Sequence, residues 1–166
     1  MTFGLRLCLA AALIVVQAYC AAAFAGENWT PQFWFTFILW LASKAPGVSS
    51  LIIISLSGLW LDGFSGDPMG THPATGMALY LLALQLTSRI QLRFVGLFVL
   101  GALGGLLTIL LGVLIVQVSA GADVGARLSE IFGPRIATMA ILLPVLFPIL
   151  NLLDRLTQRK TPLDRI

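Results

Sequence analysis

The residues best suited to chemistry lie in one short stretch of the chain. Asp62, Asp67 and His72 fall within eleven positions, and the sequence on both sides of them is strongly apolar. Carboxylates and an imidazole in such a setting could relay protons or hold a metal ion. Two carboxylates and one histidine without regular spacing are nevertheless a weak ligand set. We therefore predict no metal site and no cofactor, and keep proton or metal transport as an alternative.

The favoured interpretation of Asp62 is structural. A carboxylate can accept hydrogen bonds from the backbone N–H groups that lack partners where a helix begins, and the helix dipole favours an anion there. The predicted donors are the amides from Gly63 to Gly66 and those of Ala74 and Thr75. In this interpretation Asp62 holds a turn together.

The residues around Asp62 predict a tight hairpin between two helices. Glycines permit backbone angles that other residues avoid, and a proline pushes the residue before it out of the helical region. The first helix is predicted to end near Leu61, and the second to begin at Pro73 with Thr71 or His72 as its cap. The hairpin residues predicted to be structural, or to contact a partner, are Asp62, Gly66, Pro68, Gly70 and His72.

The composition places this hairpin in a membrane protein. The chain is 58% hydrophobic and only 10% charged, with a mean hydropathy of +0.97, whereas soluble proteins carry about 25% charged residues. The 166 residues suffice for a single transmembrane domain, 1–166, with an all-α fold. The basic residues form no stripe, so we expect no nucleic-acid partner.

The motif inventory argues against an enzyme. The sequence has no glycine-rich phosphate loop before a lysine and no HExxH motif. Its single histidine gives no Ser-His-Asp set beyond chance. We therefore predict a protein without catalytic activity.

The apolar segments predict six membrane spans. Their approximate bounds are 7–25, 31–43, 48–61, 74–88, 94–118 and 136–153. The second and third are shorter than the ~20 residues of a perpendicular span, so 31–61 could instead form one kinked helix. The first run, Leu7 to Ala25, could alternatively be a cleaved leader, but it exceeds the usual apolar core of one.

The distribution of basic residues favours the six-span arrangement. Six spans place eight Lys and Arg residues on the cytoplasmic side and two outside, whereas a fused second span strands Lys44 and splits the rest six to three. We therefore predict a multi-pass protein of the inner membrane, with both termini cytoplasmic and the Asp62 hairpin on the outer face.

Several residues inside or beside the spans have predicted roles. Trp29, Trp34 and Trp40 are expected at the membrane–water interface. Ser119 to Gly133 is expected to be a loop that carries a short surface helix. Proline lacks the N–H that a helix interior needs, so Pro144 and Pro148 should kink the last span, with Asn151 on the same face. The glutamines that could hydrogen-bond between helices are Gln17, Gln85 and Gln117.

Small residues mark two helix faces that another helix could approach closely. The first face belongs to the 7–25 span and the second to the 94–118 span. The residues of these faces are Ala11, Ala18 and Ala22 in the first, and Gly101, Gly105 and Gly112 in the second. The first face could pack within the bundle or against a partner.

The hairpin also resembles a known family. Gly58-x3-Asp62, followed by Ser65-Gly66-x-Pro68-x-Gly70-x-His72, is similar to the signature segment of the rod shape-determining protein MreD. Pro73 after the histidine and Gly63 after the aspartate depart from that pattern. The family resembles, in fold, the six-helix substrate-binding components of energy-coupling-factor vitamin transporters.

The resemblance implies a non-enzymatic inner-membrane scaffold of the bacterial cell-elongation complex. Such a protein would act with MreC to maintain rod shape and support lateral peptidoglycan synthesis. The other implied partners are MreB and RodA with its transpeptidase, reached through the complex. The alternative is the substrate-capturing component of a vitamin or small-molecule transporter, which would need convergent polar groups in a pocket near the outer face.

Overall fold

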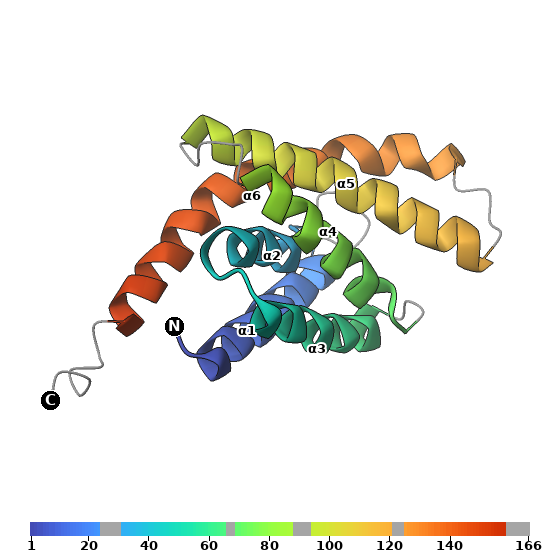
Figure 1. Cartoon of the computed structure of the whole chain (residues 1–166). Coiled ribbons are helices and arrows are strands. Elements are labelled where there is room, and N and C mark those ends of the chain that lie inside the picture. Colours follow the sequence, from blue (N-terminus) through green and yellow to red (C-terminus); the bar gives the residue numbers. More distant parts are fainter. Residues whose placement is uncertain (24–30, 66–68, 88–93, 121–124, 159–166) are drawn as a thin grey trace, which may run out of the picture.

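The computed structural model describes residues 1–23, 31–65, 69–87, 94–120 and 125–158. In these ranges the chain forms six α-helices and no strand (Figure 1). The helices are α1 (Phe3–Ala23), α2 (Phe33–Lys44), α3 (Val48–Ser65), α4 (Thr71–Thr87), α5 (Phe94–Ala120) and α6 (Gly125–Gln158). The predicted all-helical class is confirmed.

Three of the described helical segments are long and apolar enough to cross a membrane. They are Phe3–Ala23, Val48–Ser65 and Ile136–Thr157. Two shorter apolar segments, Phe33–Lys44 and Gly96–Leu111, accompany them. The chain therefore has the segments that a membrane protein needs.

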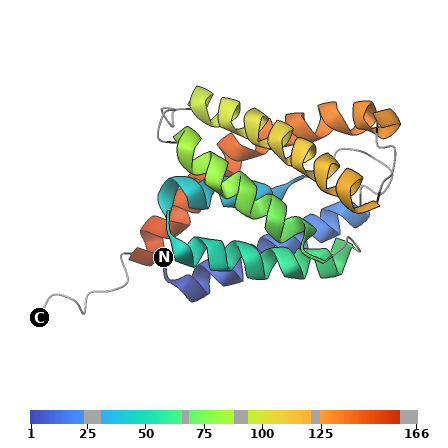
Figure 2. The same ribbon diagram turned by 45° about the vertical axis from the view of Figure 1, so that its right-hand side comes forward.

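Helix α2 is the core of the bundle. Its residues from Trp34 to Ala42 are all buried, and it contacts α1, α3, α4, α5 and α6. Figure 2 shows it enclosed by the other helices. Its 12 residues extend only about 18 Å at the helical rise of about 1.5 Å per residue. A perpendicular membrane span must cover about 30 Å, so α2 has the length of a buried core helix.

The prediction that Trp34 and Trp40 lie at the membrane interface is wrong, because both side chains are fully buried. Each indole N–H finds an acceptor inside the bundle: Trp34 Nε1 donates to Ser57 Oγ (2.8 Å) and Trp40 Nε1 to Asn151 Oδ1 (3.0 Å). A buried tryptophan is tolerated when its single polar atom is paired in this way. Trp29 lies outside the described residues.

The first turn of α2 is held by a neighbouring helix. Gln32, at the N-cap of α2, makes no side-chain capping bond, and the backbone N–H of Trp34 donates instead to Gln17 Oε1 of α1 (3.0 Å). Gln17 therefore forms the interhelical hydrogen bond expected of it. An amide that would otherwise be buried without a partner costs about 1–3 kcal/mol, so this contact fixes where α2 starts against α1.

The connections differ in part from the predicted ones. Ala45 to Gly47 separate α2 from α3, so 31–61 does not form one kinked helix. The predicted loop over 119–133 is wrong, since α5 continues to Ala120 and α6 already begins at Gly125. Gly133 and Pro134 are typical helix breakers, but the helix runs through them, and the amphipathic stretch forms its first turns.

Helices α5 and α6 pack closely through two of the predicted small residues. A Cβ on Gly101 would lie 2.7 Å from the carbonyl oxygen of Met139, and one on Gly105 would lie 3.1 Å from the Cα of Ile136. The surroundings of Gly112 lie outside the description. Both described glycines therefore set how closely the backbones of α5 and α6 approach.

Helix α6 changes direction along its length. Its first part lies beside α5, and its last part runs across the end of the bundle where α1 begins (Figure 1). Pro144 and Pro148 lie within this continuous helix, and each lacks the N–H of the helical ladder, which agrees with the predicted kink.

The alanine face of α1 is not the face that this helix buries most deeply. The buried residues of α1 are Ala10, Ile14 and Gln17. Ala11 and Ala18 are partly buried beside them, and Ala22 is exposed. Most of the surface of α1 therefore stays open to lipid or to a partner.

Candidate functional site

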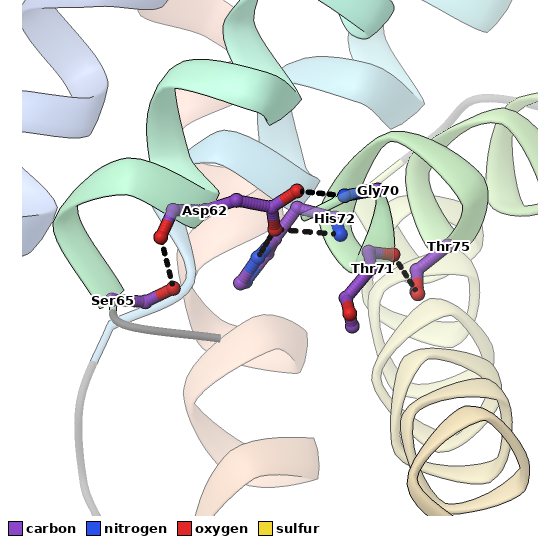
Figure 3. A network of polar contacts seen from close by, with 6 residues as sticks. All are labelled: Asp62, Ser65, Gly70, Thr71, His72 and Thr75. Carbon is purple, nitrogen blue, oxygen red and sulfur yellow. Dashed lines mark hydrogen bonds and ion pairs between the residues drawn. The ribbon is translucent and has the colours of Figure 1, made fainter. Parts of the chain in front are cut away.

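Asp62 lies in the last turn of α3 and joins it to the start of α4 (Figure 3). Its side chain is fully buried. Its Oδ2 accepts the backbone N–H of Gly70 (2.6 Å), and its Oδ1 accepts the backbone N–H of His72 (3.0 Å). The His72 ring supplies a third contact, with Nδ1 at 2.6 Å from Oδ1. Both carboxylate oxygens are therefore engaged by the next helix.

The carboxylate acts as the N-terminal cap of α4. The carbonyl of Gly70 accepts the first helical bond, from Ala74 N–H (3.1 Å), so Gly70 occupies the capping position. Gly70 has a φ of +97°, which suits glycine, and it has no side chain that could cap the helix. Asp62 supplies the missing acceptor from the preceding helix. A charged acceptor at a helix N-terminus also gains from the helix dipole.

The turn differs in detail from the predicted one. Helix α3 continues to Ser65 instead of ending near Leu61, so Asp62 is still helical. Helix α4 begins at Thr71, which makes Pro73 its third residue and not its first. Proline is tolerated there because the N–H groups of the first turn have no helical acceptor. The earlier start of α4 follows from its capping bonds to Asp62.

Asp62 accepts backbone amides, as the sequence predicted. Among the described residues these are the amides of Gly70 and His72, and not the predicted ones of Gly63 to Ser65, Ala74 and Thr75. The predicted amide of Gly66 lies outside the described residues. The prediction chose other amides because it ended the first helix near Leu61. Helix α3 continues to Ser65 instead, so its last turn lies directly against the N-terminus of α4.

The His72 ring closes the site. An ionised carboxylate only accepts hydrogen bonds, so the proton between the two side chains is assigned to Nδ1 of His72. The His72 side chain is 17% exposed. Its ring lies near two aromatic rings of α2, with centroid distances of 6.1 Å to Trp34 and 6.3 Å to Phe35. The imidazole therefore connects the capping carboxylate to the core helix.

Two glycines allow α3 and α4 to meet at this point. A Cβ on Gly58 would lie 2.8 Å from the backbone nitrogen of Pro73. A Cβ on Gly76 would lie 2.9 Å from Cγ2 of Ile54 in α3 and 2.6 Å from the Trp34 ring in α2. Real Cβ contacts are essentially never this short. Gly58 and Gly76 thus make room for the approach that lets Asp62 reach the amides of α4.

At this site the Asp62 carboxylate binds backbone N–H groups of the next helix. No group of three His, Cys, Asp or Glu side chains in the described ranges is placed to hold a metal ion. The predicted hairpin residues Gly66 and Pro68, and the nearby Asp67, lie outside the described residues. Of the predicted hairpin set, the structure brings Asp62, Gly70 and His72 together.

Sequence reasoning missed the contribution of α2 to this site. Trp34 and Phe35 lie almost thirty positions before Asp62 in the sequence. The available signal was the run of bulky apolar residues in a helix shorter than a perpendicular membrane span, which indicates a helix buried among others.

Comparison with known proteins assigns the chain to no family. No protein-family model, no curated protein and no solved structure matches the chain. Membership of a family is therefore a hypothesis that rests on the residues of the hairpin.

Proposed function

We propose that this protein is a non-enzymatic, multi-pass scaffold of the bacterial inner membrane that belongs to the cell-elongation complex. In this role it acts with MreC to maintain rod shape and to support lateral peptidoglycan synthesis. MreB, and RodA with its transpeptidase, are its more distant partners in the same complex. The proposal starts from the similarity of the hairpin to the MreD signature segment.

The observation that carries the proposal is that two residues of the signature segment, Gly58 and Asp62, hold α3 against α4. Gly58 permits the close contact with Pro73, and Asp62 caps α4 through Gly70 and His72. These residues fix one helix against another, and the carboxylate is fully buried. A fixed arrangement of apolar helices suits a protein that presents helix faces to membrane partners.

The exposed apolar surface supports the same proposal. Large apolar side chains face outward on α1, for example Val15 at 54% and Tyr19 at 75% exposure. In a membrane these faces contact lipid tails or the helices of a partner. Association between helices in lipid depends on close packing more than on a hydrophobic driving force, so the small Ala18 and Ala22 beside them favour a helix partner.

We further propose that the chain crosses the membrane six times, with both termini in the cytoplasm. In this topology the short helix α2 makes its crossing inside the bundle, where the other helices enclose it. The eight-to-two distribution of basic residues supports this topology. A reporter that is active only outside the cytoplasm should work after Asp67 or Gly125. It should fail after Arg89 or Arg159, and the reverse pattern would overturn the topology.

The elongation role is tested by depletion and copurification. Depletion of the protein from its own rod-shaped cells should make them round, and a plasmid copy should restore the rods. A copy with Asp62→Ala that still reaches the membrane should restore shape less well than one with Gly63→Ala, because a Cβ on Gly63 meets nothing within 4 Å. The tagged protein should retain MreC during purification.

Two results would contradict this proposal. Cells that stay rod-shaped after full depletion would exclude the elongation role. A small molecule that survives purification with sub-micromolar affinity would instead favour the substrate-capturing component of a transporter.

A further inference from the structure

A second polar location lies at the C-terminal half of α6, away from the Asp62 site. The residues that line an open cavity of about 290 Å³ there include, in the described part of the chain, Pro148, Asn151, Leu152 and Arg155. Its volume is close to the lower limit of small-molecule sites, about 300 Å³. It can admit a compact group such as a phosphate with its attached atoms.

The orientation of Asn151 is fixed by the core. The indole N–H of Trp40 can only donate, and it donates to Asn151 Oδ1 at 3.0 Å. The Asn151 amide must therefore direct its oxygen toward Trp40. Its NH₂ group, with two donors, has no hydrogen-bond acceptor among the residues that the structure describes. Asn151 thus offers the cavity donors and not an acceptor.

Arg155 adds more donors one helical turn further on. Its guanidinium carries five N–H donors and a permanent positive charge. Within the described ranges it forms no ion pair and no hydrogen bond. The neighbouring carboxylate of Asp154 lies instead beside the nitrogen of Met1, with Oδ1 at 2.9 Å. The polar lining therefore favours an anion with several acceptor oxygens.

The apolar surroundings indicate what carries this anion. Pro148 and Leu152 line the cavity, and the outward face of α6 continues with apolar side chains. The exposed members of this face are Val145, Ile149, Leu152 and Leu156. An anion site that opens onto such a face suits a molecule with a charged group and long hydrocarbon tails.

The position of the cavity agrees with a lipid headgroup. The last part of α6 crosses the end of the bundle where α1 begins (Figure 1), and Phe147 there lies under Lys44, the last residue of α2 (Nζ to ring centroid 5.7 Å). Cationic residues at the ends of membrane helices meet anionic headgroups at the lipid surface.

We propose that the cavity at Asn151 and Arg155 binds the phosphate of an anionic phospholipid, whose acyl chains lie along the exposed face of α6. Arg155 pairs with the phosphate oxygens, and the Asn151 NH₂ group donates a further hydrogen bond. The proposal requires a membrane location but is independent of the elongation role.

A rival explanation is that Arg155 only stabilises its own helix. A basic residue in the last turn interacts favourably with the helix dipole without any ligand. The experiment therefore compares Arg155→Gln with Arg127→Gln, which removes the same charge at the opposite end of α6.

The full chain is purified in a neutral detergent and titrated with phosphatidylglycerol or with zwitterionic phosphatidylcholine. Native mass spectrometry counts bound lipid, and thermal unfolding reports stabilisation. Phosphatidylglycerol should bind saturably to the wild type and to Arg127→Gln, and phosphatidylcholine should bind more weakly. Arg155→Gln should weaken the phosphatidylglycerol interaction about tenfold, as expected for one charged hydrogen-bonding partner.

A second variant addresses the amide. Asn151→Asp keeps the oxygen that accepts from Trp40 but replaces the NH₂ donor with a negatively charged oxygen. It should unfold at nearly the same temperature as the wild type and should lose saturable phosphatidylglycerol binding. If this variant does not fold, Arg155→Gln against Arg127→Gln still decides the question.

Three results would overturn the proposal. Arg155→Gln could bind phosphatidylglycerol as tightly as the wild type does. Phosphatidylcholine could bind equally well, which would remove the role of net lipid charge. Inorganic phosphate alone could give the same stabilisation, which would assign the cavity to free phosphate instead of a lipid.

Discussion

The two ends of the bundle use polar side chains in opposite ways. At the α3–α4 turn, Asp62 is fully buried and both of its oxygens accept hydrogen bonds from Gly70 and His72. At the C-terminal half of α6, the Asn151 NH₂ group and Arg155 border an open cavity. The acceptors of the Asp62 site are therefore paired with donors of the same chain, whereas the α6 cavity has donors that a ligand could use.

This difference separates structure from recognition. A buried charged group that is fully paired holds its surroundings in place, and breaking one of its bonds is costly. Donors that border an open cavity cost little without a ligand because water can satisfy them. We therefore expect changes at the Asp62 site to reduce stability, and changes at the α6 cavity to alter lipid binding most.

The largest loss of stability is expected from Asp62→Ala. It leaves two backbone N–H groups and the His72 ring without their acceptor. Each unsatisfied buried group costs about 1–3 kcal/mol, so the total should be about 3 kcal/mol or more. Thermal unfolding in detergent micelles measures this loss.

Asp62→Asn serves as the matched variant and should be milder. Its single carbonyl oxygen can occupy the place of Oδ1, which serves His72 twice, but its NH₂ group then faces the N–H of Gly70. One hydrogen bond is lost instead of three. If Asn and Ala were equally harmful to cell shape while both proteins stayed stable, the charge itself would matter and proton or metal transport would have to be reconsidered.

The next effect concerns the close approach of α3 and α4. Gly58→Ala places a Cβ at 2.8 Å from the Pro73 nitrogen, where backbone must move. Overpacking of this kind costs about 1–3 kcal/mol. Gly63→Ala on the same helix is the control, since its Cβ meets nothing within 4 Å and alanine has a helix propensity about 1 kcal/mol better than glycine.

Thermal unfolding of the two variants tests this comparison directly. The expected order of stability is Gly63→Ala, then wild type, then Gly58→Ala. Equal unfolding temperatures for the two alanine variants would show that α3 and α4 can separate at Gly58 without cost.

A smaller effect is expected where the core meets the α6 cavity. Asn151→Leu removes the acceptor of the buried Trp40 indole and should cost about 1–2 kcal/mol. Asn151→Asp keeps an acceptor and should cost less. Circular dichroism during heating compares the two. A leucine variant as stable as the aspartate variant would mean that the Trp40 hydrogen bond contributes nothing.

The helical class and the presence of a structural turn at Asp62 were predictable from local information. Apolar run lengths, the glycines and prolines of the turn, and the cost of an unpaired carboxylate all act within a few residues of the chain. These features identified Asp62, Gly70 and His72 as one unit. They also predicted that backbone amides would be the partners of the carboxylate.

The features that were predicted wrongly depend on contacts between distant parts of the chain. Trp34 and Trp40 were assigned to the interface because tryptophan prefers it, but Ser57 and Asn151 supply buried acceptors that no local pattern reveals. In the same way, the Gly133 to Pro134 break was overridden by a helix that continues from Gly125 to Gln158.

The smallest effect is expected from Thr75→Val at the start of α4. The Thr75 hydroxyl donates to the carbonyl of Thr71 one turn earlier, at 2.8 Å (Figure 3). Valine keeps the branched shape, and the hydroxyl of Thr75 is replaced by a methyl group in a buried position. A neutral hydrogen bond within one helix contributes about 1 kcal/mol, and the added apolar contact offsets part of it. The unfolding temperature in detergent should therefore change little, far less than for Asp62→Ala. A loss as large as that of Asp62→Ala would mean that hydroxyl groups in the first turn of α4, and not the carboxylate of α3, hold the two helices together.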